Sequence, residues 1–178
     1  MLAMTLQTVL ALLAMASAAA ACTPVLDWRE VRPQGAGLVA LFPCKPSGHS
    51  RRIVLAETSV EMTLYACSAG GATYAVGFAD LGRPQQVEPA TAALADAAAR
   101  NIGAPLPPDF VSAGVPGMTP NPKARRLSLT GRLADGTPVQ EQVAVFSRGT
   151  RVYQATVVGA ALAADDLESF FGALRLPS

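Results

Sequence analysis

The chain has 178 residues, with 14 Lys or Arg, 13 Asp or Glu and one His, and 51% of its residues are apolar. This length suits one domain, and the apolar fraction is too high for a disordered chain. A formal net charge of +1 and an aromatic content of 6% argue against a nucleic-acid-binding surface. A single His excludes a catalytic His pair and a metal site built from several His residues.

The first 21 residues have the pattern of a secretory signal peptide. They contain no charged side chain, and the apolar run 9–16 is followed by small residues that lead to Cys22. Three interpretations are open: a lipoprotein signal that leaves Cys22 as the lipidated first residue, ordinary cleavage within the alanine tract, and an uncleaved membrane anchor. We adopt the first as the working hypothesis. All three place residues 22–178 outside the cytoplasm.

The three cysteines predict one disulfide. If Cys22 carries lipid, Cys44 and Cys67 remain as a pair in a compartment where disulfides persist. Each of the two lies near the end of a strand-like run, and neighbouring strands can bring such positions within bonding distance. A redox-active pair is the alternative, but the spacing is unlike Cys-x-x-Cys. The spacing of these cysteines and His49 is also unlike that of a zinc site, so no metal or cofactor is expected.

The first half of the mature chain is predicted to form strands. In residues 60–67, apolar side chains occupy alternate positions, which is the period of two typical of a strand. The strands expected in this half are residues 27–32, 38–42, 51–56, 60–67 and 72–80. Tight turns join the last three, which predicts an antiparallel meander.

The second half contains two predicted helices and three further strands. Residues 165–174 carry apolar side chains at helical spacing, and the Ala-rich residues 89–101 have Pro at their start and Gly after their end. The strands are expected at residues 123–133, 139–148 and 151–158. Tyr153, Ala155 and Val157 lie on one face of the last strand, and Val152 and Val158 lie on the other with Gln154 and Thr156 between them. Both faces are therefore expected to be at least partly covered, which predicts a central place in the sheet.

These elements predict a single α+β domain over residues 22–178, in which an antiparallel sheet is flanked by the two helices. Residues 104–122, which follow the first helix, include six Pro. A connection of this length in a compact domain is either functional or disordered.

No sequence motif indicates a catalytic centre. Residues 35–40 match the letters of a dinucleotide-binding loop, but a strand follows them where that motif requires a helix. His49 lies in the polar stretch 45–52, which we interpret as an exposed turn. Ser47 and Ser50 are too close to His49 in the sequence to be assumed triad partners.

Six basic residues are candidates for an anion-binding face if the sheet brings them together. They are Arg51, Arg52, Lys123, Arg125, Arg126 and Arg132. The alternative is that they are solvated charges on edge strands, where charge discourages aggregation.

Two segments carry a resemblance to a known family. Residues 27–33 (DWREVRP) and 42–46 (FPCKP) resemble an uncharacterised family of lipoproteins from proteobacteria, mainly betaproteobacteria. Further similar segments are residues 64–67, 101–103, 131–138, 152–157 and 170–176. More loosely, the chain looks like PsbP-type domains, with a strand that ends in Phe-Pro, a late strand with Tyr and a final helix with paired Phe. This resemblance implies an antiparallel sheet between helices and an accessory or assembly role rather than catalysis.

We therefore expect a non-catalytic lipoprotein of the bacterial envelope, with lipid on Cys22, that faces the periplasm. Because Thr23 rather than Asp follows Cys22, the outer membrane is expected rather than the inner one. The protein would act as an accessory, assembly or binding module for an envelope protein, with residues 104–122 as the contact surface. One alternative is an envelope enzyme that acts on an anionic substrate through His49 and the six basic residues. Another is a carrier that holds a small apolar ligand between sheet and helix.

Overall fold

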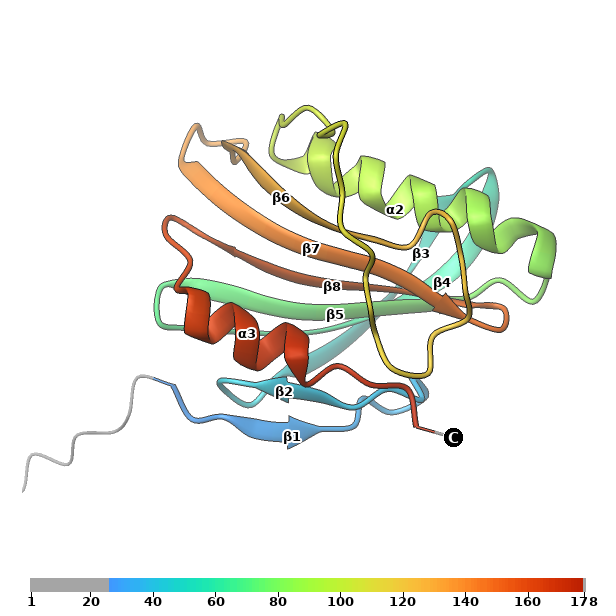
Figure 1. Cartoon of the computed structure of the whole chain (residues 1–178), viewed down its shortest axis with the longest axis horizontal. Helices are drawn as coiled ribbons and strands as arrows, with labels where there is room; N and C mark the ends of the chain where they lie inside the picture. Colours follow the sequence, from blue (N-terminus) through green and yellow to red (C-terminus); the bar gives the residue numbers. More distant parts are fainter. Residues whose placement is uncertain (1–25, 178) are drawn as a thin grey trace, which may run out of the picture.

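The centre of the molecule is a six-stranded antiparallel sheet with the strand order β3-β4-β5-β8-β7-β6 (Figure 1). The computed structural model describes residues 26–177, so the predicted signal peptide and Cys22 lie outside the described residues. The strands of this sheet are β3 (Ser47–Leu55), β4 (Thr58–Ala69), β5 (Ala72–Asp80), β6 (Arg125–Arg132), β7 (Pro138–Arg148) and β8 (Arg151–Gly159). Beside it, β1 (Arg29–Val31) and β2 (Ala40–Phe42) form a separate two-stranded sheet.

Two α-helices cover opposite faces of the six-stranded sheet, which confirms the predicted α+β fold. The helical elements are η2 (Pro84–Gln86), α2 (Val87–Asn101) and α3 (Ala164–Gly172). One buried cluster joins Phe170 of α3 to Tyr74 on the sheet, and the other joins Leu94 of α2 to Val143. Within residues 26–177, no helix has the length and apolarity that crossing a bilayer requires.

Strand β8 lies in the middle of the sheet, as the apolar residues on both of its faces predicted. It pairs with β5 on one side and with β7 on the other. Tyr153 and Val157 contribute to the core under α3, whereas Val152 contributes to the core under α2. Successive side chains of a strand point to opposite faces, so one strand supplies both cores.

Helix α2 packs closely on the sheet because its contact face is rich in alanine. Ala90, Ala95 and Ala98 are fully buried. At the end of the helix, a side chain on Gly131 of β6 would collide with the carbonyl group of Ile102, so glycine is required there. The helix lies mainly on β7 and β8. It therefore leaves part of the same face of β3, β4 and β5 without a covering layer.

The start of β3 corrects a prediction. The strand begins at Ser47, so the turn expected at residues 45–52 was wrong, whereas residues 47–52 are exposed as expected. These residues carry no apolar alternation, and most of the strand is exposed. The strand forms because it pairs in continuous register with residues 58–66 of β4. An edge strand tolerates such polar and charged side chains.

Residues 104–122 run beside β6 and are held in place by backbone and core contacts. The Arg126 amide donates a hydrogen bond to the Val111 carbonyl oxygen at 2.7 Å, and the Val111 amide donates one in return. The side chain of Val115 is buried in the core under α3. Residues 104–122 were expected to be either functional or disordered, and these contacts argue against disorder.

A disulfide fastens the β1–β2 unit to the six-stranded sheet. It joins Cys44, just after β2, to Cys67 of β4, with the two Cα atoms 6.0 Å apart, and so confirms the predicted pairing. The two cysteines are 23 residues apart in the sequence. On the chain-entropy model, closing such a loop stabilises the folded state by about 3 kcal/mol.

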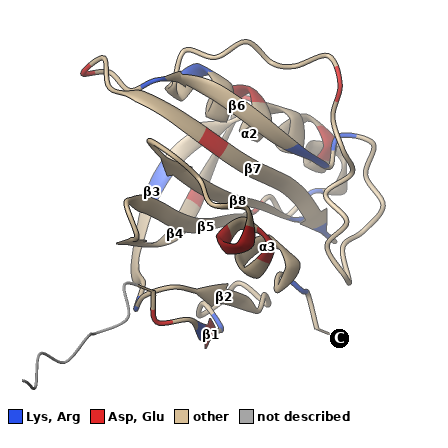
Figure 2. Ribbon diagram, turned by 60° about the vertical axis from the view of Figure 1, so that its left-hand side comes forward, with Lys and Arg blue, Asp and Glu red and all other residues tan. Residues whose placement is uncertain are grey.

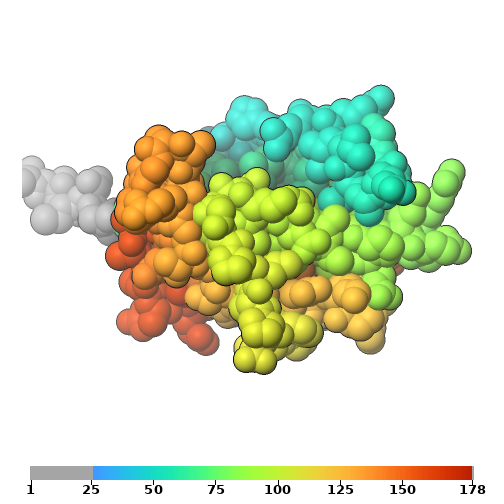
Figure 3. All heavy atoms as spheres, turned by 90° about the horizontal axis from the view of Figure 1, so that it is seen from above, coloured from blue at the N-terminus to red at the C-terminus, as the bar shows by residue number. Residues whose placement is uncertain are grey.

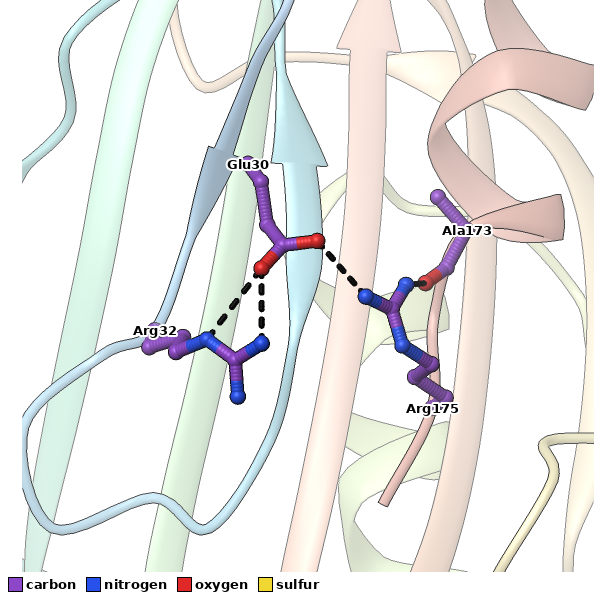
Figure 4. Close-up of polar contacts among 4 residues, drawn as sticks. All are labelled: Glu30, Arg32, Ala173 and Arg175. Carbon is purple, nitrogen blue, oxygen red and sulfur yellow. Dashed lines mark hydrogen bonds and ion pairs between the residues drawn. The ribbon is translucent and has the colours of Figure 1, made fainter. Parts of the chain in front are cut away.

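Ion pairs connect β1 to the C-terminal segment. The Glu30 carboxylate accepts hydrogen bonds from Arg175 at 2.6 Å and from Arg32 at 2.8 Å (Figure 4). Arg175 and then Arg32 hold the pKa of Glu30 below its ordinary value. Because the three side chains are exposed, these pairs orient the segments more than they stabilise the fold.

Candidate ligand-binding groove

A groove of about 660 Å³ lies between α2 and the adjacent part of the sheet. Its lining comes from β3, β4, β5, β8 and α2, so it occupies the part of this face that the helix does not cover. Figure 3 views the molecule from the α2 side, with the cyan β3–β4 region beside the green helix. This volume lies in the range of pockets that hold small molecules.

The floor of the groove on β4 and β5 is apolar. Met62 and Leu64 lie over Gly77, and Leu64 remains 44% exposed. A Cβ atom at Gly77 would lie 2.7 Å from Met62 Cε and 3.3 Å from Leu64 Cδ1. Glycine at this position therefore makes room for the two side chains to lie across β5. An exposed apolar floor favours a ligand with an apolar part.

Two polar side chains interrupt this floor on the central strand β8. Gln154 Nε2 donates a hydrogen bond to Thr156 Oγ1 at 3.1 Å. Gln154 is the register partner of Gly77, so the polar pair lies next to the apolar part of the floor. The pair offers hydrogen-bonding atoms to a ligand that lies on the sheet.

The wall formed by α2 combines small side chains with one cation. Ala93 and Ala97 line the groove, and their small size keeps it wide. Arg100 also lines the groove from the last turn of the helix. A cation is favourable at that position because of the helix dipole.

The opposite wall, on β3, combines basic side chains with the apolar residues 53–55. His49 and Arg51 line the groove from this strand. Within residues 26–177, no ion pair or side-chain hydrogen bond involves His49, Arg51 or Arg100. Glu57, at the β3–β4 turn, also belongs to the lining. With His49 neutral, the two arginines and this glutamate leave the lining with a formal charge of +1.

No protein-family model matches the chain, and no curated protein is significantly similar to it. Among residues 26–177, no three His, Cys, Asp or Glu side chains are grouped so that they could hold a metal ion. The chemical class of a ligand is therefore inferred from the residues that line the groove.

The structure changes the interpretation of His49. It lies on a strand and lines the groove, whereas the sequence placed it in a turn. Ser50 also belongs to the groove lining, but its Oγ shares a hydrogen bond of 2.8 Å with Thr63 Oγ1. The Ser50 hydroxyl is therefore paired with Thr63, and within residues 26–177 no hydrogen bond joins it to His49.

The six basic residues do not form one face, so the structure excludes one of the two alternatives that the sequence left open for them. Arg51 lines the groove, but Arg52 points to the other face of β3. The remaining four precede β6 or lie on it, and β6 is at the opposite edge of the sheet from β3 (Figure 2). One of these four, Arg126, lies 4.1 Å over the centroid of the Phe171 ring.

Three lining residues were not singled out from the sequence. Gln154 and Thr156 had a signal, because they lie between apolar Val152 and Val158 on one face of a strand predicted to be central. Burying a polar group costs free energy unless the group is hydrogen-bonded, so polar residues on such a face indicate a site with a binding role. Arg100 had no such signal, since a basic residue near the end of a helix is common.

A buried carboxyl group lies on the same face of the sheet, outside the groove lining. Glu141 of β7 is 5% exposed and has Leu129 and Val158 as its register partners on the neighbouring strands. Burial raises the pKa of Glu141 to about 7. Near neutral pH, the group is therefore divided between its neutral and its charged form.

Proposed function

We propose that the protein is a non-catalytic binding module of the bacterial envelope that holds a small molecule in the groove between α2 and strands β3–β5. The groove is the observation that carries the proposal. Its volume of about 660 Å³, the apolar floor at Met62 and Leu64 and the few polar side chains are typical of ligand sites. Of the expected functions, a ligand-holding module agrees best with this geometry.

The cellular location is part of the same proposal. Lipid on Cys22 would anchor the domain so that it faces the periplasm, and Thr23 after the cysteine favours the outer membrane. The Cys44–Cys67 disulfide supports an oxidising compartment. The resemblance to uncharacterised proteobacterial lipoproteins and to PsbP-type domains supports an accessory role.

Native mass spectrometry of the protein extracted from membranes of its native host tests this proposal. We expect a chain that begins at lipidated Cys22, contains one disulfide and retains a small molecule. Ala97→Phe, which fills the groove, should remove the small molecule. Ala92→Phe, on the same helix but outside the groove lining, is the matched control and should retain it.

Different results would contradict the envelope location and the binding function. A full-length, unmodified chain with three titratable thiols would contradict the envelope location. A wild-type protein without a small molecule, or Ala97→Phe with the same occupancy as wild type, would contradict the binding function. Thermal unfolding of both variants shows whether they are folded.

A second candidate function, contact with an envelope protein, is favoured by apolar side chains in residues 104–122. Phe110 is 50% exposed and Val111 is 71% exposed, and Leu106 is exposed as well. Exposed apolar side chains that lie close together are typical of interaction surfaces.

Replacing Leu106, Phe110 and Val111 together by serine should abolish crosslinks between this protein and its envelope partner in living cells. The loss of apolar area at the contact is the physical reason. Leu133→Ser, at an exposed leucine outside this segment, is the control and should leave the crosslinks in place. An unchanged set of crosslinked proteins in the triple variant would exclude this contact surface.

A further inference from the structure

We infer that the groove binds a single-chain amphipathic carboxylate, with the head group at the basic walls and the chain on the apolar floor. This inference rests on the proposed binding function and adds the chemical class of the ligand. Charge complementarity and the division of the lining into basic and apolar parts carry it.

The basic walls have unused binding capacity. Arg51 and Arg100 come from opposite walls, and within the described residues neither guanidinium donates to a carboxylate. Guanidinium groups bind carboxylates through two parallel hydrogen bonds, so these side chains suit an anionic head group. His49, on the same face of β3 as Arg51, adds a further hydrogen-bonding group.

The formal charge of the lining indicates one negative charge on the ligand. Two arginines and Glu57 leave the lining with a formal charge of +1 when His49 is neutral. A carboxylate balances this charge, whereas a phosphate monoester at neutral pH carries about −1.5 to −2. The charge of the lining therefore favours a carboxylate.

The positions of the charges also orient the ligand. Glu57 lies at the β3–β4 turn, near the start of α2, because Gln86 Nε2 just before that helix donates to Thr58 Oγ1 at 2.8 Å. Arg100 lies in the last turn of the helix, far from that end. The head group is therefore directed away from Glu57. The chain then lies across the groove on Met62 and Leu64, because Met62 is the register partner of Arg51 on the neighbouring strand. A volume of about 660 Å³ accommodates one chain rather than a large lipid.

Photolabelling of membranes that contain the full protein tests this inference. The probes are a dodecanoate and a dodecanol that carry the same photoreactive group at the chain end. In the wild type, the dodecanoate should label peptides of α2 or β4. In Arg51→Gln/Arg100→Gln, half-maximal labelling should require about tenfold more dodecanoate, because charge-assisted hydrogen bonds are lost. Dodecanol labelling should change less than about twofold, since its head group has no charge.

Control variants and competitors separate the outcomes. Arg52→Gln, on the other face of β3, should label like the wild type. An equal change for both probes in the double variant, or an equal change in Arg52→Gln, would overturn the head-group assignment. Stronger competition by dodecyl phosphate than by dodecanoate would overturn the choice of a carboxylate.

Failure of the inference is distinguishable from failure of the proposed function. If Ala97→Phe blocks labelling by both probes while the double arginine variant behaves like the wild type, the groove binds ligands without regard to charge. If the wild type is labelled only outside the groove lining while native mass spectrometry still shows a small molecule that Ala97→Phe loses, the inference fails and the proposed function stands.

Discussion

Replacing Phe170 with alanine is expected to lower the free energy of unfolding by about 3–5 kcal/mol. Phe170 is 0% exposed, and its ring centroid lies 5.5 Å from the centroids of Phe42 and Tyr74. The side chain thus joins α3 to β2 and β5, and its removal leaves a cavity among three elements that cannot easily collapse. Equilibrium unfolding in urea, with wild type and variant compared at the same pH, measures the loss.

Phe110→Ala is the matched control for this prediction, because it is the same change at a side chain that is 50% exposed. It should cost less than about 1 kcal/mol, since little apolar surface returns to water and no buried cavity forms. If Phe170→Ala proved as mild as Phe110→Ala, the core under α3 would not have the packing described above.

Replacing Glu141 with glutamine is expected to remove most of the loss of stability that the wild type shows between pH 5 and pH 8. The unfolded carboxyl group ionises near 4.5 and the folded one near 7, because burial penalises its charged form. Between these values, the folded state keeps a proton that the unfolded state has released, so stability falls as the pH rises through this window. A shift of this size corresponds to about 2–3 kcal/mol between pH 5 and pH 8.

Glu141→Gln should lose most of the dependence of its stability on pH, whereas a control variant should keep it. At pH 8, Glu141→Gln should be more stable than the wild type by about 2–3 kcal/mol, and near pH 4.5 the difference should nearly vanish. Glu61→Gln, at an exposed position of β4, should retain the pH dependence of the wild type. Urea titrations across this pH range measure both, and equal stability of Glu141→Gln and wild type at pH 8 would refute the burial effect.

Much of the fold was predictable because local patterns coincide with the tertiary arrangement. Apolar residues on both faces of residues 151–158 predicted a central strand, and β8 is central. The helical spacing of Phe170 and Phe171 predicted core residues, and both are buried. The pairing of Cys44 with Cys67 followed from cysteine number and strand ends, and the structure contains that disulfide. In each case, the burial of apolar or cysteine side chains leaves a signal in the sequence itself.

The groove was not predictable in the same way. His49 lies on the polar part of an edge strand that pairs with β4, and this part has no apolar alternation to reveal it. The basic residues of β3 and β6 were considered together, but the strand order places them at opposite edges. Arg100 approaches β3 only through the packing of α2 across the sheet.

The class of fold, the two core-facing helices and the disulfide follow from local patterns, because apolar periodicity and cysteine spacing can be recognised along the chain. The position of the open face, and the polar side chains that meet there, depend on how distant segments pack together. Strand order and the placement of a helix depend on contacts between distant segments, and side chains that remain solvated in a groove contribute no periodic signal of their own.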